Sequence, residues 1–224
     1  MSLLERSPFV VALACATLFA PPARAQEPAR TPRFGVCKPV SERTSPVGCW
    51  ILVDNPIGTP SRRQVYWHLD RYPTRAAADS ARGRFGTVVE ALGKSWLFTI
   101  EKAGWRPKRA GVHVADIGPL TLHARQRYNA LFMEAITEPG MTSAVHKHSG
   151  PEAWYTEAGI TCLETPKAKY VGTAGHPAIV PEGAKMFLTA IGKEQRRAIT
   201  LILHPTGQPP TDMVHDWKPK GLCR

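Results

Sequence analysis

Three side chains able to bind a metal ion, those of His146, His148 and Glu152, fall within seven consecutive residues. His146 and His148 are two residues apart, and on a β-strand this spacing directs both imidazoles to the same face. The intervening Ser149-Gly150-Pro151 is typical of a tight turn, so Glu152 can face the histidines from the neighbouring antiparallel strand. Two imidazoles and one carboxylate suit Fe(II), Mn(II) or Ni(II), and zinc or copper can also bind them. We therefore predict a divalent metal site on these residues, with an unmetallated polar pocket as the alternative.

The residues around this cluster resemble the first signature of the cupin superfamily, Gly-x5-His-x-His-x3,4-Glu-x6-Gly. Every fixed position of that signature is present between Gly140 and Gly159. The family's second signature, Gly-x5-Pro-x-Gly-x2-His-x3-Asn, is matched only as far as its second glycine. The matching residues are Gly175, Pro181 and Gly183. The second signature is therefore degenerate in this chain.

Two positions of the second signature depart from the family pattern. Met186 stands where the family carries a third metal-binding histidine, and Ala190 replaces the asparagine. A methionine is soft and neutral, so it either fills volume or binds Cu(I) weakly. The resemblance implies a metal ion held by His146, His148 and Glu152, with Met186 beside the open coordination position.

The resemblance covers about residues 127–206 and implies a small jelly-roll barrel with the metal site inside it. The same stretch contains several short candidate strands and no helical periodicity, which independently favours a sandwich or a barrel. Alternation along the strand that begins at Glu152 directs Trp154 inward, as a wall of the pocket or as part of the core, and Tyr155 outward. The predicted fold class is mainly β, a cupin jelly-roll barrel in the C-terminal half with an N-terminal α+β extension.

The resemblance implies one of two classes of function. The first is a metal-dependent enzyme, a dioxygenase or an isomerase acting on a small organic molecule, with Glu152 as both ligand and catalytic base. The alternative is a non-catalytic module that binds a small ligand or a cell-envelope polyanion. The intact set of His146, His148 and Glu152 favours the enzyme, whereas Met186 favours the binding module. Enzymatic activity, the substrate, the metal and assembly as a homo-oligomer stay open at this point.

The first 25 residues have the pattern of a signal peptide. An apolar run from Pro8 to Ala20 is followed by an Ala-x-Ala site, so we expect cleavage after Ala25. No later segment is apolar enough to span a membrane, and we expect a periplasmic or secreted protein. The mature chain then divides into an N-terminal arm with an α+β extension (26–126), the barrel (127–206) and a C-terminal tail (207–224).

Export determines how the cysteines are interpreted. Cys15 leaves with the signal peptide, and Cys37, Cys49, Cys162 and Cys223 remain. An even number of cysteines in an oxidising compartment predicts two disulfides, in one of three pairings. None of the spacings is Cys-x-x-Cys, which disfavours a zinc knuckle and a thioredoxin-type redox motif.

The N-terminal extension combines alternating strands with one stretch of helical periodicity. Apolar residues between Ala78 and Leu92 recur at steps of three and four, which predicts an amphipathic helix over 75–92. Thr74 is its expected N-cap, and Gly93 its expected end. Strands are predicted over 49–53, 64–70, 95–101, 112–114 and 120–122.

The formal net charge of +11 suits contact with an anionic ligand or surface. The basic residues lack the interleaved aromatics of a nucleic-acid platform, and export also argues against nucleic acid as a partner. The basic pairs Arg62-Arg63 and Arg196-Arg197 are interpreted as solvated surface. The other histidines, among them His68 and His113, are interpreted as single surface or core groups.

Overall fold

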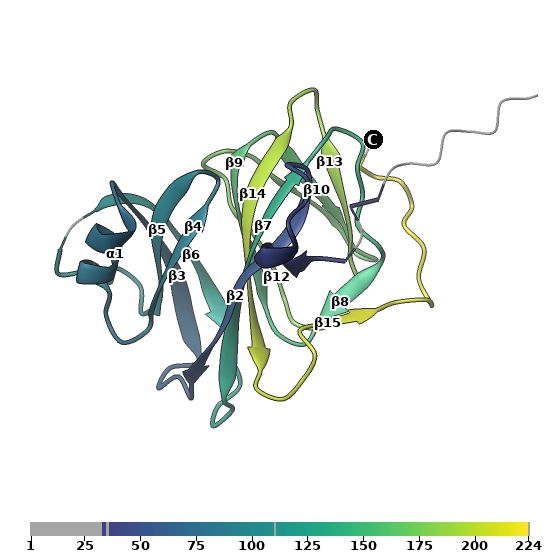
Figure 1. Cartoon of the computed structure of the whole chain (residues 1–224). Helices are drawn as coiled ribbons and strands as arrows, with labels where there is room; N and C mark the ends of the chain where they lie inside the picture. Colours follow the sequence, from purple (N-terminus) through teal and green to yellow (C-terminus); the bar gives the residue numbers. More distant parts are fainter. Residues whose placement is uncertain (1–32, 35, 110, 224) are drawn as a thin grey trace, which may run out of the picture. The chain divides into compact units, whose positions relative to one another are not determined.

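The computed structural model describes residues 33–34, 36–109 and 111–223, and the predicted signal peptide lies outside these ranges. The described chain is mainly β, as predicted, with its strands in four sheets (Figure 1). It also contains a 3-10 turn, η1 (Val40–Glu42), and one short α-helix. No helix within the described ranges is both long and apolar enough to cross a membrane.

The largest sheet has six strands, and both of its faces are covered. In spatial order its strands are β1 (Lys38–Pro39), β2 (Gly48–Gly58), β7 (Tyr128–Thr137), β14 (Arg196–Pro205), β9 (Glu152–Ala158) and β12 (Ala178–Val180). Along β7, Ala130 and Phe132 belong to one apolar cluster, whereas Leu131 and Met133 belong to another. Because both faces are buried, β7 has an almost continuous apolar sequence instead of an alternating one.

A four-stranded sheet covers the Phe132 face. Its strands, in spatial order, are β4 (Gly86–Ala91), β5 (Lys94–Glu101), β3 (Gln64–Tyr72) and β6 (Val112–Thr121). The Trp67 and Phe98 rings lie 5.3 Å apart, and the Phe98 and Phe132 rings 5.0 Å apart, so aromatic contacts join the two sheets. The buried Glu134 of β7 accepts a hydrogen bond from the backbone N–H of Leu92, at the β4–β5 turn. The N-terminal half therefore both adds β2 to the barrel's sheet and packs a second sheet against it.

The opposite face of the six-stranded sheet encloses the interior of the jelly roll. It is opposed by the strands β8 (His146–His148), β15 (Thr211–Met213), β11 (Lys169–Gly172), β10 (Ile160–Glu164) and β13 (Phe187–Ile191). Trp154 and Val180 of the large sheet pack there against Leu163 and Leu188. Strand β15 lies in the part of the sequence that was expected to be a tail, and it pairs with β8.

The helix predicted over 75–92 is wrong beyond its first two turns. Helix α1 spans Arg75–Ala81, and Thr74 caps it by accepting a hydrogen bond from the N–H of Ala77. The following residues form β4, in which Val88 packs toward α1 and Val89 packs into the core between the sheets. Burial of both faces of a strand produced apolar spacings that resemble a helical period.

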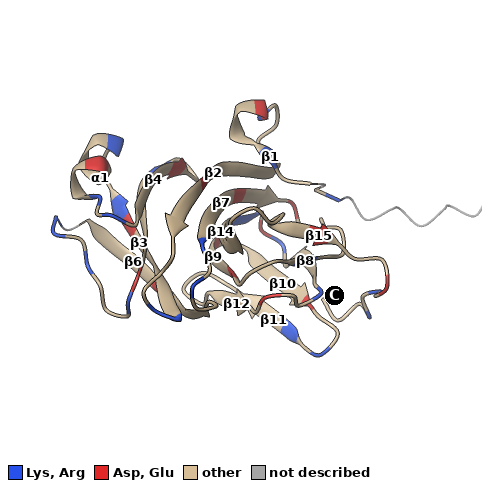
Figure 2. Ribbon diagram, turned by 90° about the horizontal axis from the view of Figure 1, so that it is seen from below, with Lys and Arg blue, Asp and Glu red and all other residues tan. Residues whose placement is uncertain are grey.

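Both predicted disulfides are present, and each fixes a terminal segment. Cys37 is bonded to Cys49 at the start of β2, and Cys162 of β10 is bonded to Cys223 near the C-terminus. Both segments run past the jelly roll, on the side away from the four-stranded sheet (Figure 2). The two bonds therefore tether the segments that precede and follow the strands of the barrel.

A hydrogen-bonded cluster lies on the face of the four-stranded sheet that points away from the barrel. The buried His68 has Nδ1 at 2.5 Å from Oδ1 of Asp116 and Nε2 at 2.9 Å from the carbonyl oxygen of Lys102. Asp116 also accepts hydrogen bonds from both terminal nitrogens of Arg106, at 3.1 and 2.9 Å. Nε2 of His113 lies 3.3 Å from the same carboxylate. These histidines, interpreted above as single groups, are thus joined through Asp116.

Candidate functional site

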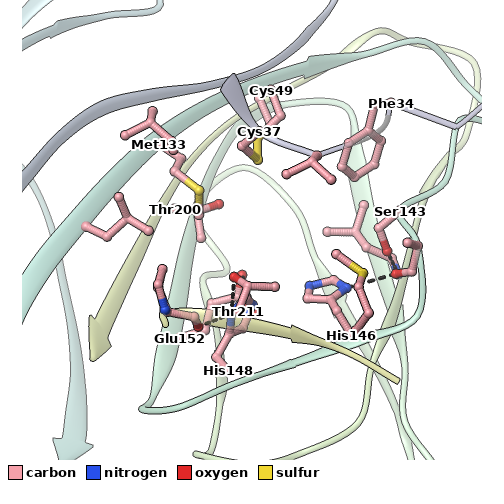
Figure 3. Close-up of a pocket in the computed structure, with 18 of the residues that line it drawn as sticks. Phe34, Cys37, Cys49, Met133, Ser143, His146, His148, Glu152, Thr200 and Thr211 are labelled. Atoms are coloured by element: carbon pink, nitrogen blue, oxygen red, sulfur yellow. Dashed lines mark hydrogen bonds and ion pairs between the residues drawn. A yellow bond between two sulfur atoms is a disulfide. The ribbon is translucent and has the colours of Figure 1, made fainter. Parts of the chain in front are cut away.

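The jelly roll contains a cavity of about 310 Å³. Its polar lining includes His146, His148 and Glu152, and Figure 3 shows His148 and Glu152 on the side opposite Phe34 and the Cys37–Cys49 disulfide. The rest of the wall is largely apolar, with Ile51, Leu131, Met133, Ala135 and Leu188. A mostly apolar wall with a few converging polar groups is typical of a small-molecule site, and this volume lies near the lower end of the usual range of ~300–1,000 Å³.

Strand geometry brings the three predicted ligands to this cavity. His146 and His148 occupy the two ends of β8, and their rings meet edge to face with centroids 4.9 Å apart. Glu152 begins β9 after the predicted turn. Gly150 is required in this turn, since a Cβ there would lie 1.7 Å from the carbonyl oxygen of Leu203. The close approach of β14 to the turn therefore helps to place Glu152 beside the histidines.

Backbone carbonyls fix the orientation of both imidazoles. Nδ1 of His146 lies 2.8 Å from the carbonyl oxygen of Ala144, and Nδ1 of His148 lies 3.0 Å from that of Pro210. A carbonyl oxygen can only accept, so each Nδ1 carries a proton and donates it. Nε2 of each ring is then the nitrogen that could bind a metal ion. Histidines that bind metals commonly donate the other ring N–H to a backbone carbonyl in this way.

His148 and Glu152 form a buried charge pair. Nε2 of His148 lies 3.6 Å from Oε1 of Glu152, which is too long for a hydrogen bond. Burial lowers the pKa of His148, but the Glu152 charge outweighs that effect and the pKa is raised. Burial raises the pKa of Glu152, but the His148 charge outweighs it and the pKa is lowered. His146 differs, because burial and the adjacent His148 lower its pKa and leave the ring neutral near pH 7.

The chemistry of these donors fits a divalent metal ion. Nε2 of His148 and Oε2 of Glu152 are buried without a hydrogen-bond partner in the described chain. Such orphaned donor atoms, with Nδ1 of both rings already fixed, are what a cation would satisfy. No group of three His, Cys, Asp or Glu side chains within the described residues already stands in the geometry of a metal site.

Met186 and Trp154 lie next to this site but outside the cavity lining. Met186 forms an antiparallel bridge with His146, in which the two backbones exchange hydrogen bonds of 3.1 and 2.8 Å. Its side chain packs with Trp154, Leu163 and Val180 in an apolar cluster. Trp154 points into the barrel and Tyr155 packs toward the four-stranded sheet, as strand alternation predicts.

Sequence reasoning missed Arg196, which was interpreted as solvated. Arg196 is only 1% exposed and lines the cavity, whereas Arg197 faces outward and pairs with Glu157. The regular pairing of β14 with β7 places Arg196 on the same face as Thr200. Ile199 and Ile202 of β14 belong to different apolar clusters, so both faces of the strand are buried and alternation alone could not have singled out Arg196.

The two terminal segments supply the remaining walls. Phe34 and the Cys37–Cys49 bond come from the N-terminal arm, while Pro210 and Thr211 come from the C-terminal tail. Oγ1 of Thr211 lies 3.1 Å from Nδ1 of His148, so the tail contacts a predicted ligand directly. These walls depend on contacts between residues far apart in sequence. No local sequence motif predicts that the two terminal segments reach the cavity.

Comparison with known proteins gave matches among solved structures. No family model and no curated protein matches the chain. A cupin-2 domain protein from Shewanella frigidimarina is 16% identical over 38% of this chain and 76% of its own length, with a TM-score of 0.29. A cupin-like protein from Thermotoga maritima is 15% identical over 39% of this chain and 64% of its own, with a TM-score of 0.34.

A third match is the DMSP lyase DddQ from Ruegeria pomeroyi. It is 14% identical over 41% of this chain and 45% of its own length, with a TM-score of 0.34. The chain therefore spans less than two thirds of the second and third of these structures. Two of these three structures are described as cupin proteins, and at these identities and TM-scores the matches carry no argument about the family or function of this chain.

Proposed function

We propose that this protein is an exported, cupin-type enzyme that holds a divalent metal ion on His146, His148 and Glu152 and acts on a small organic molecule bound in the cavity. One observation carries the proposal: two imidazoles are fixed by backbone carbonyls so that Nε2 is available beside a buried carboxylate. Two disulfides, which persist in oxidising compartments, support a periplasmic or secreted location.

The chain's own residues would have three tasks. His146 and His148 bind through Nε2, and Ala144 and Pro210 hold those rings in place. Glu152 would hold the ion through Oε2, which has no partner in the described chain, and its Oε1 would then be the atom that accepts a proton from the substrate. A bound divalent ion would supply the Lewis acidity that an isomerase requires, whereas a dioxygenase would need a redox-active ion such as Fe(II).

The test is the metal content of the parent and of two variants purified in parallel. We expect His148→Ala to lose stoichiometric metal, with affinity falling by more than the ~10–100-fold that loss of an outer-shell contact costs. His123→Ala is the matched control, because that imidazole is 69% exposed and pairs with Glu182 outside the cavity. Circular dichroism checks that both variants fold.

A non-catalytic binding module is the second candidate, and Met186 in place of a third histidine favours it. Under this alternative the parent takes up none of Fe(II), Mn(II), Ni(II), Zn(II) or copper when they are offered. Binding of a small molecule to metal-free protein would then assign His148 and Glu152 to hydrogen bonding in a ligand pocket.

A further inference from the structure

The cavity contains a buried cation whose charge nothing in the described chain neutralises by direct contact. Arg196 is 1% exposed, its Nε donates to the hydroxyl of Thr161, and it forms no ion pair with a described residue. Its Nη1 is buried and has no hydrogen-bond partner there. Burial lowers the pKa of Arg196 to about 10 and the Glu152 charge opposes this, so the guanidinium is charged at neutral pH.

A buried charge without a partner is costly, and proteins seldom retain one without a use. Arg197, the next residue, shows the usual solution: it faces outward, where Nε lies 3.3 Å from Oε2 of Glu157 and Nη2 donates to the carbonyl of Leu92. Arg196 lacks such a partner and lines the cavity. Its free donors are therefore available to a molecule that enters the cavity.

The groups around Arg196 indicate which chemical group of that molecule would bind there. Thr200 lies two residues along the same face of β14 and lines the cavity. Thr137, directly opposite Arg196 on β7, has a buried hydroxyl without a partner among the described residues, but it lies outside the cavity lining. A guanidinium presents paired N–H groups that match the two oxygens of a carboxylate.

The remaining wall is apolar, with Ile51, Leu131, Met133 and Leu188. We infer that the substrate is a small organic acid whose carboxylate is bound by the Arg196 guanidinium and whose apolar body fills the cavity beside His146, His148 and Glu152. This inference names the substrate class of the proposed enzyme and so rests on the proposed function. Arg196 is a substrate-binding residue in this arrangement.

The test measures binding, not activity, with pairs of molecules that differ only in charge. Hexanoate and benzoate are compared with hexanamide and benzamide by the rise in melting temperature and by calorimetric titration of the mature protein. We expect at least one acid to raise the melting temperature while its amide does not. The inference would be overturned if each amide bound as tightly as its acid. It would also be overturned if phosphate bound while neither acid did.

Three variants locate the effect. Arg196→Met should weaken binding of the acid by about tenfold or more, since a charged hydrogen-bonded contact is lost. Arg196→Lys keeps the positive charge but lacks the paired N–H groups of the planar guanidinium. We expect its affinity for the acid to lie between the affinities of the parent and of the methionine variant. Arg197→Met is the matched control and should bind as the parent does. Unchanged binding in both Arg196 variants would make the guanidinium a counter-charge for Glu152 and refute the assignment.

Repeating the titrations after treatment with EDTA separates this inference from the proposed function. Acid binding that depends on Arg196 in a protein that takes up no metal would support the carboxylate site and refute the metal enzyme. A metal-loaded protein that binds neither acid would support the metal enzyme and refute the carboxylate site. The lysine variant keeps the test decisive if Arg196→Met fails to fold.

Discussion

Nδ1 of His148 lies 3.0 Å from the carbonyl oxygen of Pro210, a residue 62 positions further along the chain. Pro210 immediately precedes β15, which pairs with β8, and the Cys162–Cys223 bond tethers the end of the same segment. The orientation of a candidate metal ligand is therefore set by a segment outside the strands of the predicted barrel.

If the proposed metal site is present, this relationship predicts that the Cys162–Cys223 bond contributes to metal binding as well as to stability. We expect Cys162→Ser with Cys223→Ser to lower the free energy of unfolding by about 2–4 kcal/mol, because the bond closes a loop over a separation of 61 residues. Metal affinity should fall too, as the tail no longer holds His148. Denaturant titration and metal titration measure the two effects.

The Cys37–Cys49 pair provides the control, since it lies across the cavity from His148 and spans only 12 residues. Its double serine variant should lose less stability and keep its metal affinity. Thiol titration of the denatured, unreduced parent should find almost no free thiol. Equal metal affinities in both double variants would show that the tail holds its position without the bond.

Replacing Met186 by histidine should strengthen metal binding. Met186 and His146 are paired directly in an antiparallel bridge, so a histidine at 186 would lie beside the candidate ligands. A fourth ligand added to three should raise the affinity for a divalent ion by at least about tenfold. The measurement is a competition titration against a chromogenic chelator.

Met133→His is the matched control for this variant, because Met133 lines the cavity from β7 and does not adjoin His146. It should leave affinity near that of the parent. If a folded Met186→His variant binds metal no better than the parent, the side chain at 186 stays in its apolar cluster.

The Asp116 cluster predicts a pH-dependent contribution to stability. Burial raises the pKa of Asp116, but Arg106 and His68 outweigh it and lower the pKa. A carboxyl group with a lowered folded pKa stabilises the protein above its unfolded pKa, and this contribution disappears as the pH falls through the folded value. Asp116→Asn should therefore cost about 1–2 kcal/mol at pH 7, mainly because His68 and Arg106 lose a charged partner.

The difference between parent and Asp116→Asn should begin to shrink below about pH 4, where Asp116 of the unfolded chain becomes protonated, and it should vanish below the lowered pKa of the folded state. Urea unfolding at a series of pH values measures it. Asp216→Asn is the control: Asp216 pairs with Lys185 at an exposed position, so its loss should change stability little. A constant difference for Asp116→Asn across the pH series would show that packing, not charge, is responsible.

The barrel was largely predictable because its strands and its motif are local in sequence. His146, His148 and Glu152 are close enough that strand parity and one turn bring them together. The disulfide count followed from an even number of cysteines. The helix was over-extended because Val88 and Val89 are buried on opposite faces of β4, and this pattern resembles a helical period.

The rest of the site depends on contacts that no local pattern records. Phe34 and Pro210 reach the cavity from opposite ends of the chain. Arg196 was interpreted as solvated because two adjacent arginines usually are, yet alternation along β14 directs one of them inward and the other outward. A charged residue at the start of an otherwise apolar strand can be assigned only when the neighbouring strands are known.

Both faces of β7 are buried, and each face has a different role: one lines the cavity and the other packs against the four-stranded sheet. Leu131 and Met133 bound the cavity, whereas Ala130 and Phe132 hold the four-stranded sheet. Substitutions at the first pair can reshape the space offered to a ligand while the contact between the sheets is kept. A library of size changes restricted to Leu131 and Met133 could therefore alter ligand preference without dismantling the scaffold, so β7 is the natural place to redesign specificity.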